Sequence, residues 1–121
     1  MENQIKIRTK QIGIQVIKLV DEIPKKMSTW VISKQIMRCS TSVGANYRAA
    51  CRAKSEADFL NKLRIVEEES DETSYWLEIL EEASLIEPVR IEKLKKEVNE
   101  ITAIIVASQK TVQKKPVSNK N

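Results

Sequence analysis

The fold is decided by the central stretch at residues 35–80, which reads QIMRCSTSVGANYRAACRAKSEADFLNKLRIVEEESDETSYWLEIL. Apolar residues recur there every three or four positions, which is the period of one buried face on an α-helix. Ser55, followed by Asp58 three residues later, is typical of a helix N-terminus. The stretch therefore predicts two long helices joined by a short link. Their buried faces hold Ile36, Cys39, Val43, Tyr47 and Ala50 in the first, and Phe59, Leu63, Val66, Ser70, Thr73, Leu77 and Leu80 in the second.

The flanking segments carry the same period. Pro24 ends a first helix, since proline interrupts a helix interior, Ser28 or Thr29 caps the second, and Pro88 fits the first turn of the last. Four long helices with short connections predict an all-α, antiparallel up-down-up-down four-helix bundle. We expect one domain at residues 1–113, with helices at about 4–23, 29–53, 56–84 and 88–113, and a disordered polar tail at 114–121.

A polar layer is predicted inside the bundle. Ser70 and Thr73 interrupt the apolar face of the third helix, and Asn46 lies at the edge of the second helix's face at about the same height. A buried amide needs hydrogen-bond partners, so we expect Asn46 to bond near Ser70 or Thr73. Small residues around Gly44 make the second helix thin, which predicts that another helix packs closely there.

Charge is segregated by helix although the net charge is only +4. Residues 27–54 hold five cations and no acid, whereas residues 55–84 hold ten acids and two cations. On a helical wheel, four of these cations form one stripe over short side chains. Such a stripe fits the phosphate backbone of RNA or DNA; it fits equally an acidic helix of a neighbouring subunit, or a solvated face with no partner. The candidate binding residues are Lys34, Arg38, Arg48 and Arg52, with Lys54 just beyond.

The third helix has a second apolar side in addition to its core face. A helix in a simple bundle needs one apolar stripe, and a second one usually meets a partner. We therefore predict self-association. The alternative is a wide face that covers the flanking helix of the same chain. The candidate interface residues are Ile65, Tyr75, Trp76, Ile79 and Ala83.

Catalytic chemistry is not indicated. The chain has no histidine, which excludes imidazole ligands and Ser-His or Cys-His pairs, and it has no Gly-rich phosphate loop. One enzymatic interpretation stays open, in which the Glu-x-x-Glu pairs Glu69/Glu72 and Glu97/Glu100 hold Mg²⁺ as in some all-α pyrophosphohydrolases. The helical wheel places these carboxylates on flanks, so we expect no enzyme activity, cofactor, metal or small-molecule substrate.

The two cysteines indicate a reduced compartment. Cys39 and Cys51 stand in one helical stretch, about 18 Å apart at ~1.5 Å per residue, whereas a disulfide needs Cα atoms within ~7 Å. No run of ~18 apolar residues could span a membrane, and the N-terminus does not resemble a secretory signal. We expect a cytoplasmic protein without membrane contact.

The central stretch resembles the bacterial 23S rRNA-intervening-sequence proteins, which are small four-helix bundles. Two segments depart from the family's pattern: Arg48-Ala49-Ala50 stands where the family often has Glu-Gly, and Glu67-Glu68-Glu69-Ser70 where it often has small residues. The matching positions are Gln35, Ile36, Arg38, Ser42 and Asn46 on the second helix, then Arg52, Lys54, Phe59 and Leu60.

The resemblance implies a homo-oligomer, with a pentamer favoured. Relatives include the accessory protein of diversity-generating retroelements, a basic pentameric ring that works with a reverse transcriptase and RNA. We therefore expect a non-enzymatic oligomer that associates with RNA, DNA or a nucleic-acid enzyme through the basic stripe. The alternative is a protein-only oligomeric adaptor, in which the stripe pairs with the acidic third helix of a neighbouring subunit.

Overall fold

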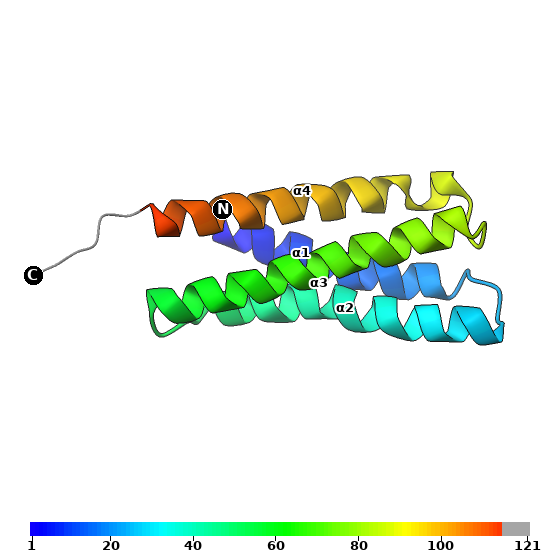
Figure 1. The fold of residues 1–121 in the computed structure, drawn as a ribbon, viewed down its shortest axis with the longest axis horizontal. Helices are drawn as coiled ribbons and strands as arrows, with labels where there is room; N and C mark the ends of the chain where they lie inside the picture. The colour runs from blue at the N-terminus through cyan, green and yellow to red at the C-terminus, as the bar shows by residue number, and fades with distance from the viewer. Residues whose placement is uncertain (115–121) are drawn as a thin grey trace, which may run out of the picture.

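The computed structural model describes residues 1–114, which form four α-helices and no strand. The helices are α1 (Glu2–Val20), α2 (Met27–Cys51), α3 (Glu56–Glu82) and α4 (Pro88–Gln113). Figure 1 shows the four helices side by side, with the α1–α2 and α3–α4 connections at the same end. The predicted tail at 114–121 lies outside the described residues, apart from Lys114.

Neighbouring helices run antiparallel, because residue numbers rise along one helix as those of their contact partners fall along the other. Between α1 and α4, Arg8 meets Glu97 while Glu22 meets Arg90. The side-chain contacts between α3 and α4 show that these two helices are also antiparallel. Helix α2 packs between α1 and α3. Helices α2 and α4 lie on a diagonal of the bundle and do not pack against each other. The prediction of an all-α antiparallel bundle is confirmed.

The helix boundaries reflect local hydrogen bonds. Helix α2 begins earlier than predicted, because Thr29 lies inside its first turn, where its Oγ1 accepts the Lys26 N–H at 2.8 Å. Helix α3 begins as predicted, since Ser55 Oγ accepts the Asp58 N–H at 3.1 Å. Pro88 is the first residue of α4. Helix α1 ends at Val20, earlier than predicted, and a turn carries the chain to α2.

The Ser55 cap gives a direct test of this boundary. Ser55→Ala removes the acceptor of one α3 N–H, and such a loss typically costs about 1 kcal/mol. Urea unfolding of the two proteins should show that difference. Ser28→Ala is the matched control, because Ser28 is an exposed serine whose side chain caps no helix within residues 1–114. Equal effects of the two substitutions would show that the cap contributes nothing to stability.

The core contains the predicted apolar faces. Ile36, Val43, Leu63 and Leu77 are fully buried, together with matching residues of α1 and α4. The core also holds small polar side chains, which accounts for the interruption in the α3 pattern.

The polar layer forms with different partners from those predicted. Ser70 and Thr73 are fully buried. The Ser70 hydroxyl bonds Thr102 of α4 at 2.6 Å, and Thr73 Oγ1 donates to Cys39 Sγ of α2 at 3.3 Å. The prediction for Asn46 is wrong: its Nδ2 donates to the Ser42 carbonyl, one turn back, at 3.0 Å. The amide is satisfied within α2, so the layer does not depend on it.

Helices α1 and α2 approach closely where each has a glycine. A Cβ atom placed on Gly44 would lie 3.0 Å from the Lys10 Cα, and one on Gly13 would lie 3.2 Å from the Thr41 Cγ2. The prediction of close packing at Gly44 is confirmed, and α1 is the helix that packs there. This contact brings the outer side chains of the two helices together.

Candidate functional site

A shallow groove runs along the outside of the α1–α2 contact. Its volume is about 280 Å³, and its floor is made of small residues, because the two glycines let the backbones meet. Apolar side chains of α1 form one wall and cations stand at the rim. We call this the α1–α2 groove; it is lined by Lys6, Lys10, Gly13, Ile14, Ile17, Thr41, Gly44, Ala45 and Arg48.

The cations of the α1–α2 groove come from both helices. Lys6 and Lys10 lie one turn apart on α1, and Arg48 faces them from α2. Within residues 1–114, no carboxylate lies within 4.0 Å of any of these three charges. Arg52, one turn beyond Arg48, extends the positive surface toward the end of α2. The groove therefore presents positive charge that no direct ion pair within residues 1–114 neutralises.

Arg38 does not belong to this surface, although the sequence placed it on the stripe. Its guanidinium pairs with Glu72 and, at 3.1 Å, with Glu69, both on α3. Arg38 lowers the pKa of the Glu72 carboxyl, which also accepts the Trp76 Nε1–H at 3.2 Å. This arginine joins α2 to α3. Lys34 and Lys54, the remaining predicted residues, are exposed.

Both Glu-x-x-Glu pairs are held by an arginine of a neighbouring helix. Arg38 bonds the first pair on α3, and Arg8 of α1 bonds Glu97 at 2.7 Å and also Glu100. The pairs lie at two different edges of the bundle. No cluster of three Asp, Glu, Cys or His side chains suited to a metal occurs among residues 1–114. The geometry therefore favours a structural role for these carboxylates.

These ion pairs make stability depend on acid pH. Arginine partners lower the pKa of Glu22, Glu72 and Glu97 below the ordinary value of 4.5. In the unfolded chain these carboxyls protonate first, so their contribution is present above pH 4.5 and is lost as the pH falls through the lower folded pKa values. The urea midpoint should therefore fall between pH 7 and about pH 3.

Removing the arginines should weaken this acid sensitivity. A double variant Arg8→Met, Arg38→Met should start with a lower urea midpoint at pH 7 and lose less of it on acidification. Lys110→Met is the control, because Lys110 has no ion pair within residues 1–114. The same acid dependence in both variants would contradict a role for these ion pairs.

The second apolar side of α3 is only partly exposed. Trp76 packs against the core, and Ile65 and Ile79 are half-buried. Tyr75 and Ala83 are exposed, and Tyr75 contacts the Trp76 ring edge-on at 5.0 Å between centroids. Trp76 therefore fits the alternative to self-association, in which a wide apolar face of α3 packs within the same chain. Other exposed large apolar residues lie mainly on α1 and α2: Ile7, Ile17, Met27, Trp30, Val31 and Met37.

Sequence reasoning missed two features of the α1–α2 surface. One is the contribution of Lys6 and Lys10, whose i, i+4 spacing shows a basic edge on α1 but not which helix it meets. The other is Trp30, whose ring lies 4.4 Å from Lys34 Nζ, in the geometry of a cation–π contact. The i, i+4 spacing of Trp30 and Lys34 could have predicted this contact from the sequence.

A cleft of about 540 Å³, larger than the α1–α2 groove, lies between α1 and α4. Ile12, Leu19 and Leu94 contribute its apolar part, and the Arg90–Glu22 ion pair lies at its edge. Its charges are mixed and partly paired within the chain. It lacks the single sign of charge that marks the α1–α2 groove.

None of the helices formed by residues 1–114 is both long and apolar enough to cross a membrane. Cys39 and Cys51 are free cysteines, and burial raises the pKa of both thiols.

Comparison with known proteins agrees with this architecture. No curated protein matches the chain. A crystal structure of a protein with unknown function from the S23 ribosomal protein family of Bacteroides thetaiotaomicron superposes with a TM-score of 0.81. The two chains are 35% identical, and the match covers 88% of this chain and 98% of the other. The family profile of the 23S rRNA-intervening sequence proteins matches residues 1–107. The chain therefore belongs to the 23S rRNA-intervening sequence protein family.

Proposed function

We propose that this protein is a non-enzymatic, cytoplasmic homo-oligomer that holds the phosphate backbone of RNA or DNA in its α1–α2 groove. The observation that carries the proposal is the convergence of Lys6, Lys10 and Arg48 from two helices, with no carboxylate of residues 1–114 in ion-pair distance. Cations left unneutralised along a groove are the usual electrostatic footprint of nucleic-acid binding.

The shape of the groove supports backbone contact rather than base recognition. Gly13, Gly44 and Ala45 form a low floor, so a phosphate can approach the flanking lysines. Phosphate contacts position a nucleic acid without carrying sequence information. Binding is therefore expected to be strongly salt-dependent and similar for unrelated sequences. A nucleic-acid enzyme bound to the same strand would be brought to the protein in this way.

A second candidate function is a protein-only adaptor. It is favoured by the exposed apolar residue Ile17, which lines the groove together with the cations, because apolar surface flanked by charge is typical of protein interfaces. In that case the acidic outer face of α3 of a neighbouring subunit, with Tyr75, would cover the groove. Charge reversal in the groove would then dissociate the oligomer.

Fluorescence anisotropy tests the proposal with a labelled single-stranded RNA and a DNA duplex. Each neutralised phosphate contributes a slope of about −0.9 for duplex DNA in log affinity against log salt. Three groove cations per subunit predict a slope near −2.7 for the duplex and roughly a 40-fold loss of its affinity between about 50 and 200 mM salt. Absence of binding at the lower salt would contradict the proposal.

Light scattering on the same samples tests the assembly. A homo-oligomer should give a mass several times the 13.9 kDa of one chain, with five copies favoured by the family resemblance. A monomer that still binds nucleic acid would remove the oligomer from the proposal and leave the groove in place.

A further inference from the structure

An exposed tryptophan stands on the α1–α2 side of the bundle, beyond the groove. Trp30 is 63% exposed, which is unusual for a large aromatic side chain that could have been buried. Lys34 Nζ lies 4.4 Å from the ring centroid, so the cation lies over one face of the indole. Trp30 is not among the partly buried apolar residues that pack against the core in residues 1–114.

The surroundings of Trp30 are basic and hollowed. The ring lines a cleft of about 510 Å³ at the α1–α2 corner, within the ~300–1,000 Å³ range of small-ligand sites. Lys25 and Lys26 line the same cleft, as does one acid, Asp21. Within residues 1–114, neither lysine nor Lys34 has a carboxylate in ion-pair distance.

We infer that Trp30 is a stacking site for an unpaired base of single-stranded nucleic acid, with Lys25, Lys26 and Lys34 contacting the flanking phosphates. Every base has a π-face, so stacking on an aromatic ring beside basic residues binds single strands with little sequence preference. The inference rests on the proposed function. It adds that the preferred substrate is single-stranded, because the bases of a duplex already stack on one another.

The position of Trp30 is consistent with a strand that also occupies the α1–α2 groove. Trp30 and Arg48 both lie on α2, 18 residues apart, which corresponds to about 27 Å along the helix axis at 1.5 Å per residue. An oligonucleotide of about 12 nucleotides falls within the ~4–16 nucleotide site size of single-strand binders. A strand running along the outside of α2 would meet the base-stacking ring at one end and the phosphate contacts at the other.

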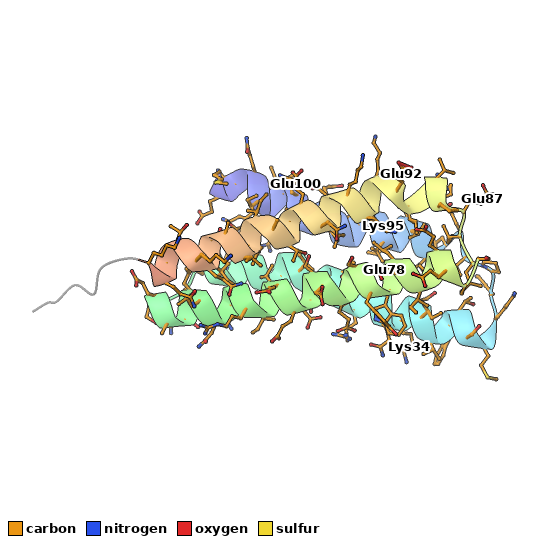
Figure 2. The ribbon with its side chains drawn as sticks, turned by 45° about the horizontal axis from the view of Figure 1, so that its top comes forward. Lys34, Glu78, Glu87, Glu92, Lys95 and Glu100 are labelled. Atoms are coloured by element: carbon orange, nitrogen blue, oxygen red, sulfur yellow. The ribbon has the colours of Figure 1, made fainter. Side chains whose placement is uncertain are left out.

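An anionic membrane surface is the competing partner for an exposed tryptophan beside lysines. Figure 2 shows Lys34 at one edge of the bundle, and Glu87 and Glu92, near the start of α4, at the opposite edge. The α1–α2 and α3–α4 connections share one end of the bundle (Figure 1), so a flat bilayer covering that end would also meet these acids. A strand lying along α2 would avoid them, which favours nucleic acid.

Tryptophan fluorescence can test this site directly. Trp76→Phe leaves Trp30 as the only tryptophan, so the emission then reports this ring alone. Addition of oligothymidine of about 12 nucleotides should quench it, because the base stacks on the indole. Trp30→Ala should weaken oligothymidine binding by about 5- to 150-fold, and Trp30→Phe by much less. The salt slope should stay unchanged, since no charge is removed.

The controls separate this inference from the proposed function. Val31→Ala changes a neighbouring exposed apolar residue and should leave affinity unchanged. A duplex of the same length should bind wild type and Trp30→Ala equally. If oligothymidine binds but Trp30→Ala has no effect, the stacking site is wrong and the groove stands. If neither nucleic acid binds, both proposals are wrong. Emission that shifts to the blue with anionic phosphatidylserine vesicles, without quenching by oligothymidine, would overturn the inference in favour of a lipid surface.

Discussion

Gly44→Leu is expected to destabilise the protein strongly, because Gly44 lies in the close contact between α1 and α2. Even a Cβ atom at this position would lie 3.0 Å from the Lys10 Cα and 3.1 Å from its backbone nitrogen. These are backbone atoms of a packed helix, so α1 must move away from α2 to admit a leucine. Overpacking of this kind costs typically 1–3 kcal/mol, occasionally more, and we expect at least about 2 kcal/mol in urea unfolding at pH 7.

Two related variants test the cause of this loss. Gly44→Ala should cost less, because the smaller clash is partly offset by a gain of about 1 kcal/mol in helix propensity. Ala103→Leu adds a leucine to an exposed position of α4 and should leave stability nearly unchanged. If Gly44→Leu is as stable as wild type, the close approach of α1 and α2 is wrong, and with it the floor of the groove.

The double reversal Lys10→Glu, Arg48→Glu should cause a large loss of nucleic-acid affinity. It removes two phosphate contacts, each with a slope of about 0.9 in log affinity against log salt for a duplex. Lowering the salt from 1 M to 0.1 M lets two such contacts strengthen binding roughly 60-fold, so at 0.1 M salt the variant should bind roughly 60-fold more weakly than the wild type. Anisotropy titrations should show that loss, and the salt slope should become shallower by about 2.

A matched control has the same change in net charge on another face. Lys93→Glu, Lys110→Glu reverses two exposed cations of α4, which does not pack against α2. This variant should keep most of the affinity and the wild-type salt slope. Equal losses in the two double variants would mean that net charge, and not the α1–α2 groove, determines binding. Loss of the oligomer in the groove variant alone would favour the adaptor function.

Much of the bundle could be predicted from the sequence because it depends on periodicity within one helix. Ile36, Val43, Leu63 and Leu77 are buried because each belongs to a three-four repeat, whatever the neighbouring helix contributes. Ser55 and Pro88 mark helix starts through local backbone chemistry. These signals need no knowledge of how the helices are arranged.

The candidate site required information that no single helix contains. Arg38 has the right angle for the basic stripe, but the arrangement of α3 places Glu69 and Glu72 within its reach. Lys6 and Lys10 join Arg48 only because two glycines bring α1 against α2. The Asn46 amide donates its hydrogen bond to a carbonyl of α2 itself, and a helical wheel does not show such a bond. Pairing between helices therefore decides which cations stay available.

Lysine footprinting tests the location of bound nucleic acid most directly. The protein is acetylated at low reagent concentration with and without single-stranded RNA, and the modified lysines are quantified by mass spectrometry. We expect protection of Lys6, Lys10 and Lys34 and unchanged reactivity at Lys93 and Lys110 on α4. Protection confined to α4, or no difference at Lys6 and Lys10 while RNA is bound, would contradict the α1–α2 groove as the binding surface.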